Sequence, residues 1–186
     1  MFIQTEATPN PATLKFLPGK PVLPGGTRDY RDAAAAAESP LAQKLFSVAG
    51  VAGVFLGQDF ITITKAQAEW QHLKPAILGL IMDHYLSGAP VLIDAGQEQA
   101  GLSEEDFDEA DGEIVATIKQ LLDTRVRPAV AQDGGDITFH GLKEGVVFLN
   151  MKGSCAGCPS STATLKHGIE NLLRHFVPEV SEVRAV

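Results

Sequence analysis

The chain has 186 residues, of which 45% are hydrophobic, and a formal net charge of -8 at pH 7. This length fits one large domain or two small ones, and the apolar content is typical of a globular protein. Two cysteines are too few for the disulfide framework of a secreted protein, which indicates a reducing compartment. The longest uncharged apolar run, 45–57, is shorter than the roughly 20 residues of a membrane span, so we expect no membrane partner.

The negative charge is concentrated in one segment of the chain. Residues 88–113 carry nine acidic residues and no basic one, whereas acidic and basic residues nearly cancel in 1–87 and in 114–186. Such a run of like charges is typical of a solvated linker, so we expect residues 88–113 to join two domains flexibly. Neither flanking region has the basic excess of a nucleic-acid-binding protein, and we expect no nucleic-acid partner.

The N-terminus has the composition of neither a secretory signal nor an arginine-rich transit peptide. Its first fourteen residues contain Glu6 and no lysine or arginine. Together with the cysteine usage, this predicts a cytoplasmic location in a bacterium, or the mitochondrial matrix if the chain is a processed form.

Residues 1–87 predict a small α+β domain. Apolar residues in 70–88 recur at three- and four-residue spacing, which is typical of an amphipathic helix. Ser39 before Pro40 is a helix-start signal, and residues 57–59 between two β-rich runs predict a hairpin. In chain order we expect strands at 2–6 and 13–16, a helix from 40 to about 50, strands at 51–56 and 60–64, and a helix at 70–88. We find no chemical motif in this region.

Residues 114–186 predict a second α+β domain with the order α-β-β-α-β. Its first helix has an apolar face up to Val126, and we expect Pro128 to kink or end that helix. Residues 143–145 predict a hairpin turn. In chain order we expect a helix from 114, strands at 137–142 and 146–151, a helix from Pro159 to a stop at Pro178, and a short strand at 180–186. The predicted fold class is therefore α+β, as two small domains joined by the acidic linker.

Both cysteines lie in the segment 153–161, here called the cysteine loop, between the end of a strand and the start of a helix. Unpaired N–H groups and the dipole at a helix N-terminus favour the thiolate, the form that binds metal or attacks disulfides. We therefore expect Cys155 and Cys158 to be accessible and reactive. Upstream, Asp-Gly-Gly-Asp at 133–136 predicts a tight turn, which we favour over a ligand-binding role.

The Cys-x-x-Cys spacing alone is compatible with structural zinc, an iron–sulfur cluster, thiol redox chemistry or inert cysteines. Zinc sites and cubane iron–sulfur clusters usually need four protein ligands, and one chain supplies two thiols. His167 and His175 are eight residues apart, about 12 Å along a helix, which is too far to share one metal. We expect His72, His84 and His140 to lie at the surface or half-buried.

A symmetric dimer would supply four thiolates without any further ligand, and two-fold dimers are the commonest oligomers. Thiol redox chemistry stays open, because thioredoxin-like proteins also keep their reactive pair between a strand and a helix. Here, however, the preceding strands form a hairpin, and the domain is small for the βαβ core of that fold.

Three runs in the C-terminal half resemble the C-terminal domain of NifU and the Nfu proteins. They are Leu-Leu-Asp-Thr-Arg-Val-Arg-Pro-Ala-Val at 121–130, Asp-Gly-Gly-Asp at 133–136 and Gly-Ser-Cys-Ala-Gly-Cys-Pro-Ser-Ser at 153–161. The N-terminal run Phe-Ile-Gln-Thr-Glu-Ala-Thr-Pro-Asn-Pro at 2–11, with Phe-Leu-Pro-Gly at 16–19, is similar to the Nfu N-terminal domain. Together the two resemblances extend over nearly the whole chain.

The resemblance implies a scaffold or carrier for iron–sulfur clusters, not an enzyme. It implies that Cys155 and Cys158 ligate a [4Fe-4S] cluster held between the cysteine pairs of two subunits, and that the cluster passes to recipient apoproteins. The implied partners are a second copy of the chain, upstream cluster donors and the recipients. We assign partner recognition and reach to the N-terminal domain and the linker. A thiol–disulfide oxidoreductase and a structural zinc dimer stay as alternatives.

Overall fold

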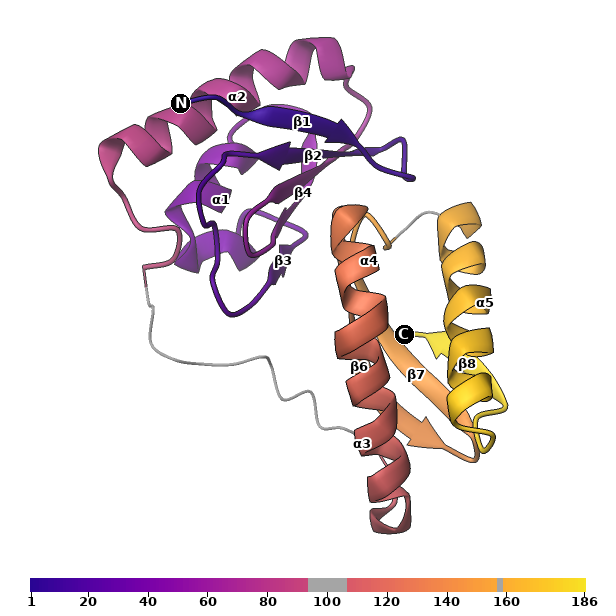
Figure 1. Ribbon diagram of the computed structural model, residues 1–186. Coiled ribbons are helices and arrows are strands. Elements are labelled where there is room, and N and C mark those ends of the chain that lie inside the picture. Colours follow the sequence, from indigo (N-terminus) through magenta and orange to yellow (C-terminus); the bar gives the residue numbers. More distant parts are fainter. Residues whose placement is uncertain (94–106, 157–158) are drawn as a thin grey trace. The chain divides into compact units, whose positions relative to one another are not determined.

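The computed structural model describes residues 1–93, 107–156 and 159–186, without the side chains of 159–161. Cys158 and the centre of the expected linker therefore lie outside the described residues. The chain forms two compact units, residues 1–100 and 101–186. Both units combine helices with a sheet, which confirms the α+β fold class (Figure 1).

The N-terminal unit contains a five-stranded antiparallel sheet with the strand order β1-β2-β5-β4-β3. The strands are β1 (Gln4–Ala7), β2 (Thr13–Leu17), β3 (Arg28–Tyr30), β4 (Val51–Leu56) and β5 (Ile61–Lys65). The helices are the 3-10 turn η1 (Ala35–Glu38), α1 (Pro40–Phe46) and α2 (Trp70–Ser87). All the expected elements form, and β3 and η1 are additional.

Both α-helices of this unit pack on one face of its sheet. The register places Leu14 beside Ile63 and Phe16 beside Ile61, so these apolar side chains alternate to the same face. They share one buried cluster with the helix residues Leu41, Leu45, Leu73, Ile77 and Ile81. The three- and four-residue spacing on α2 therefore marks the core-facing side of that helix, as the sequence predicts.

The chain after α2 folds back onto the start of α1. The Ser39 hydroxyl accepts a hydrogen bond from the N–H of Ala42 and so caps α1. The same hydroxyl donates to the carbonyl of Val91 at 2.7 Å, and the N–H of Ile93 donates to the carbonyl of Glu38 at 2.8 Å. The first residues of the expected linker thus pack on the N-terminal unit.

His84, near the end of α2, is fully buried. The expectation of a surface or half-buried histidine is wrong here, because His84 continues the buried face of α2 that Leu73, Ile77 and Ile81 form. Among the described residues neither ring nitrogen makes a hydrogen bond of good geometry. Burial, and then the positive charge of Lys44, lower the pKa of His84 below its ordinary value of 6.5. An interaction with the backbone of Ala89 opposes this lowering of the His84 pKa only in part.

This burial predicts a loss of stability of the N-terminal unit at acidic pH. The unfolded chain takes up a proton at His84 as the pH falls through about 6.5, whereas the folded chain resists until its lower pKa. The contribution of the neutral, buried His84 to the free energy of unfolding is therefore complete above about pH 6.5 and declines below it. Thermal unfolding followed by the fluorescence of Trp70, the single tryptophan, should show a smaller pH dependence in His84→Leu. The exposed His72 gives the control His72→Gln, and an unchanged pH dependence in His84→Leu would contradict this assignment.

The C-terminal unit packs its helices on one face of a three-stranded sheet with the order β6-β7-β8. Its helices are the 3-10 turn η2 (Glu109–Asp111), α3 (Gly112–Leu121), the π turn η3 (Leu122–Val126), α4 (Arg127–Gln132) and α5 (Pro159–Phe176). The strands are β6 (Gly135–Lys143), β7 (Val146–Gly153) and β8 (Glu182–Ala185). The β6–β7 pair is antiparallel and β8 runs parallel to β7, so the expected α-β-β-α-β order is confirmed.

The first helix does not end at Pro128 as expected: it continues past this residue, and the helix type changes just before it. Because proline has no N–H to donate, a regular α-helical ladder cannot pass through this position. The chain forms a π turn just before it, in which the N–H of Arg127 donates to the carbonyl of Leu122, and Pro128 then lies in the first turn of α4. In Figure 1 the helix accordingly runs on from α3 to α4.

Alternate residues of β7 face the core of the C-terminal unit. Val147, Leu149 and Met151 are buried, and their register partners on β6 include Ile137 and Phe139, which are also buried. The core cluster is completed by helix residues such as Val115, Ile118, Leu122, Val130, Ile169 and Leu173. The end of β7 is thereby fixed at residue 153, where the cysteine loop begins.

Candidate metal centre

The cysteine loop leaves β7 at Gly153 and leads into α5 at Pro159, as the sequence predicts. In Figure 1 this connection lies at the end of the unit where α4 ends and α5 begins. The N–H of Ala156 donates to the carbonyl of Gly153 at 3.1 Å, and the hydroxyl of Thr162 donates to the carbonyl of Cys155 at 3.1 Å. The loop is therefore held both by its own turn and by the first turns of α5.

Cys155 is buried, with 6% of its surface exposed, and it belongs to the hydrophobic core cluster of the unit. Burial raises the pKa of the Cys155 thiol to about 11, and the negative charges of Asp133 and Asp136 act in the same direction. A hydrogen bond with Ser154 lowers this pKa, but it offsets the raising effects only in part. The expectation of an accessible thiolate is thus wrong for Cys155, because its side chain enters the core. Cys158 lies outside the described residues.

The buried thiol packs against the 133–136 turn, which joins α4 to β6. A Cβ atom at Gly135 would lie 2.6 Å from the sulfur of Cys155 and 2.7 Å from the carbonyl oxygen of Lys152. Only a glycine leaves room for this contact. The preceding Gly134 has φ +81°, a conformation that favours glycine, so the expected tight turn is confirmed. The contact with Cys155 is a role for this turn that the sequence does not reveal.

The 133–136 turn also holds the backbone of the cysteine loop. The N–H of Ser154 donates to the carbonyl of Gly134 at 3.3 Å, and its hydroxyl donates to the carbonyl of Asp133. Gly135 and Gly153 are register partners at the ends of β6 and β7. Three successive residues of the turn therefore contact three successive residues at the start of the cysteine loop.

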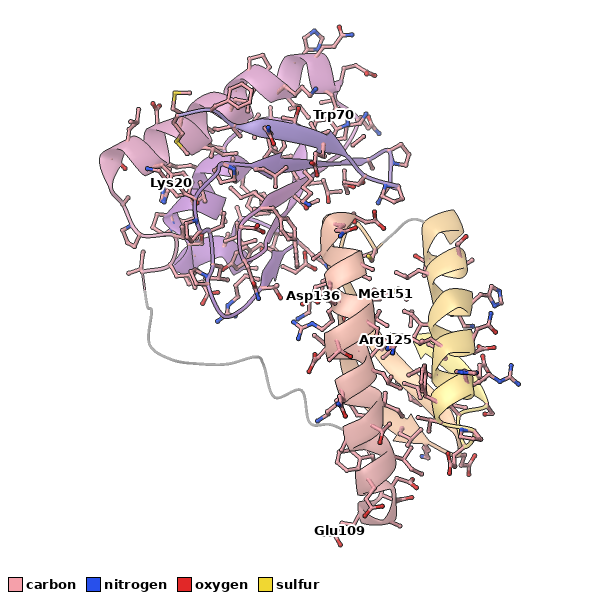
Figure 2. The ribbon with its side chains drawn as sticks, viewed as in Figure 1. Lys20, Trp70, Glu109, Arg125, Asp136 and Met151 are labelled. Carbon is pink, nitrogen blue, oxygen red and sulfur yellow. The ribbon has the colours of Figure 1, made fainter. Side chains whose placement is uncertain are left out.

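An ion pair between a buried carboxylate and a partly exposed guanidinium fixes the far end of this turn. Asp136, labelled in Figure 2, is 4% exposed and accepts two hydrogen bonds from the guanidinium of Arg127, at 2.9 and 3.0 Å. Arg127 also donates to Asp123 at 3.0 Å, a partner that is exposed. These bonds raise the pKa of Arg127 above its ordinary value. Sequence reasoning missed this pair, since nothing in the spacing of nine residues signals it.

The other histidines do not gather near the cysteine loop. His167 and His175 are exposed on α5. His72 is exposed on α2 and His140 is half-buried on β6, so the expectation for these two is confirmed. In the described ranges, which omit Cys158, no group of three or more histidine, cysteine or acidic side chains is arranged to hold a metal ion. A site formed by Cys155 therefore needs ligands from outside the described residues.

Two protein families match this chain, one for each unit. The family described as scaffold protein Nfu/NifU N terminal matches residues 3–88, and the NifU-like domain matches residues 118–184. Over 188 aligned residues the chain is 51% identical to a human protein named "NFU1 iron-sulfur cluster scaffold homolog, mitochondrial". That match covers the whole of this chain and 72% of the human protein. The chain belongs to the Nfu family.

Other members of the Nfu family extend this match. NifU-like protein 4 of Arabidopsis thaliana, named as mitochondrial, is 50% identical over 186 residues, with 98% of this chain and 65% of that protein covered. The chain thus spans about two thirds of the length of these relatives. A solved NifU-like protein from Saccharomyces cerevisiae shares 30% identity over half of this chain and 86% of its own. The TM-score of that match is 0.46.

Proposed function

We propose that this Nfu-family chain is an iron–sulfur cluster scaffold, with Cys155 and Cys158 as the cluster ligands. A [4Fe-4S] cluster would be held between the cysteine pairs of two subunits and passed to recipient apoproteins. The observation that carries the proposal is the place of Cys155, in the loop between β7 and α5 of the unit that matches the NifU-like domain. Whole-chain similarity to proteins named as cluster scaffolds supports it.

The ligand count favours two subunits. A cubane cluster usually takes four thiolates, and each chain holds two cysteines. Iron binds the thiolate, so loading must remove the proton that burial keeps on Cys155. The side chain must also leave its contact with Gly135 to meet the cluster. The apo chain therefore protects its thiol, and loading couples deprotonation to an opening of the cysteine loop.

Such a site binds and releases a cargo instead of turning over a substrate, so we propose that the chain is not an enzyme. A cluster shared between two chains on short loops is released when the subunits separate or when recipient thiolates replace those of the scaffold. Upstream cluster donors and recipient apoproteins are the expected partners. We assign their recognition to the N-terminal domain, residues 1–87, and the reach between domains to the acidic linker, residues 88–113.

The names of the relatives favour the mitochondrial matrix over the bacterial cytoplasm as the place of this activity. Within the part of the chain that the structure describes, no helix is long and apolar enough to cross a membrane. Neither unit carries the basic excess of a nucleic-acid binder. We therefore keep membrane and nucleic-acid partners out of the proposal.

Replacing either cysteine with serine should abolish cluster binding, because an alcohol is a far weaker iron ligand than a thiolate. Native mass spectrometry of the oxygen-free parent chain is expected to show a dimer with four irons and four sulfides. Cys155→Ser and Cys158→Ser should each lose this species. His167→Gln, at an exposed histidine of α5 that we do not propose as a ligand, should retain it.

Three other outcomes would overturn the proposal or its ligand assignment. A metal-free monomer that loses two hydrogens on oxidation, and that fails to take up iron during anaerobic reconstitution, would favour thiol–disulfide exchange between Cys155 and Cys158. A dimer with one firmly held, colourless zinc would favour a structural site. Retention of the full cluster in Cys155→Ser would refute that ligand assignment.

A further inference from the structure

The ion pair between Arg127 and Asp136 lies one residue away from Gly135, whose backbone packs against the sulfur of Cys155 and is here called the wall of the thiol site. Asp136 follows Gly135 directly, and a Cβ atom at Gly135 would stand 2.6 Å from the sulfur of Cys155. Any shift of the strand end that carries Asp136 therefore moves this wall. The position of the thiol depends on how firmly that strand end is held.

Arg127 and Asp136 close a short loop that contains α4 and the turn after it. At one end of the loop, the N–H of Arg127 donates to the carbonyl of Leu122 within the π turn. At the other end, the carboxylate of Asp136 accepts both guanidinium bonds and the N–H of Ile137 at 2.8 Å. The turn is further tied to α4, since the N–H of Gly134 donates to the carbonyl of Ala131 at 3.0 Å.

The π turn aims Arg127 at this carboxylate. A π turn inserts an extra residue relative to an α-helical turn, and such insertions recur at functional sites. Here it spans Leu122–Val126, directly before the arginine. Asp136 is 4% exposed, so water cannot satisfy its two carboxylate oxygens. The planar guanidinium of an arginine donates to both oxygens at once, whereas a lysine would not.

We propose that Arg127 and Asp136 are a positioning pair for the cysteine loop: their two-pronged contact holds the 133–136 turn against Cys155 and so controls how readily that thiol becomes available for cluster binding. The functional meaning of this control rests on the proposed scaffold role. The contact itself acts on the apo chain and can be tested without iron. Neither residue touches the cluster in this scheme.

The test measures how fast Cys155 reacts in Arg127→Gln. In a Cys158→Ser background Cys155 is the only thiol, and the neutral disulfide 4,4′-dithiodipyridine reports its reaction by absorbance. We expect a rate at least about tenfold higher in Arg127→Gln at zero denaturant, as hydrogen bonds to a charged group are lost from a locally opening segment. Loss of the cation alone would favour the neutral thiol and slow the reaction, so acceleration cannot come from charge.

Two further variants separate positioning from general destabilisation. Arg127→Lys keeps the positive charge but loses the paired hydrogen bonds of the guanidinium. Its Cys155 should react more slowly than in Arg127→Gln and faster than in the parent. Asp123→Asn removes only the exposed partner of Arg127 and should react like the parent. The accelerated rate should depend weakly on urea, because local opening exposes little surface. A rate that instead follows global unfolding, with a steep urea dependence, would make the pair merely structural.

Iron loading provides the second readout, on the full chain with both cysteines. After anaerobic reconstitution, the cluster absorbance of Arg127→Gln should fall faster than that of the parent when an iron chelator is added. If the parent binds no iron, the proposed function fails while the thiol rates still decide the positioning role. If Arg127→Gln and its parent react with the disulfide at equal rates, the positioning role is overturned, whatever iron the chain binds.

Discussion

Gly135→Ala is expected to destabilise the C-terminal unit by on the order of 3 kcal/mol, the upper part of the range for overpacked sites. The added methyl group would lie 2.6 Å from the sulfur of Cys155 and 2.7 Å from the carbonyl oxygen of Lys152. The second obstacle is backbone in the β6–β7 pair, so a change of side-chain rotamer cannot remove it. Either the strand ends separate or the thiol is driven out of the core.

Urea unfolding followed by far-UV circular dichroism measures this loss, and Trp70 fluorescence identifies the transition of the other unit. Gly168→Ala is the matched control, because it adds the same methyl group in α5 with no atom within 4 Å. A glycine inside a helix costs roughly 0.5–1 kcal/mol relative to alanine, so this control should gain stability. If both variants changed stability by the same amount and sign, the close contact at Gly135 would not be the cause.

The displaced thiol in Gly135→Ala should also react faster with a neutral disulfide. This outcome would connect the steric wall at Gly135 with the ion pair at its side, because both act on the same sulfur. The two perturbations share one segment, so their effects on the reaction rate should not add. A double variant with Arg127→Gln should therefore react little faster than the more reactive single variant.

Sequence predicts well those helices and strands whose residue pattern lies within the element itself. The apolar spacing along α2 records which face of that helix is buried, and both α2 and β7 form where expected. Ser39 and Pro40 likewise mark the start of α1. In each of these cases, residues close in sequence determine the structure.

Elements that depend on distant partners could not be predicted. The strand β3 is three residues long and exists because it pairs with the edge of β4, more than twenty residues later. The return of residues 91–93 onto the start of α1 depends on contacts with Ser39 and Glu38, more than fifty residues earlier. Sequence patterns record local preferences, whereas these features arise from tertiary packing.

The candidate site likewise combines features that the sequence shows with features that depend on distant residues. The Cys-x-x-Cys motif and the strand–loop–helix setting of Cys155 are visible in the sequence, and they led to the right family. The burial of the thiol is not visible, because it requires Gly135, twenty residues earlier, to lie against the sulfur. The dipole argument for a reactive thiolate therefore gave the wrong direction for the pKa of Cys155, which burial raises.

Phe16→Ala should destabilise the N-terminal unit by about 3–5 kcal/mol, the usual cost of removing a fully buried phenylalanine. Phe16 has no exposed surface and lies on the interior strand β2, beside Ile61 and among the core residues of both helices. Trp70 fluorescence during urea unfolding measures the loss. Phe2→Ala makes the same chemical change at a side chain that is 79% exposed, and it should alter stability by no more than about 0.5 kcal/mol.

The same titration tests whether the chain consists of two independent domains. The two units have separate buried clusters, so a cavity at Phe16 should leave the circular dichroism transition of the C-terminal unit in place. The Trp70 transition alone should move to lower urea. If both transitions moved together, the units would unfold as one cooperative body. The proposed division into residues 1–87, a flexible linker at 88–113 and residues 114–186 would then be wrong, and so would the role we give the linker in reaching partners.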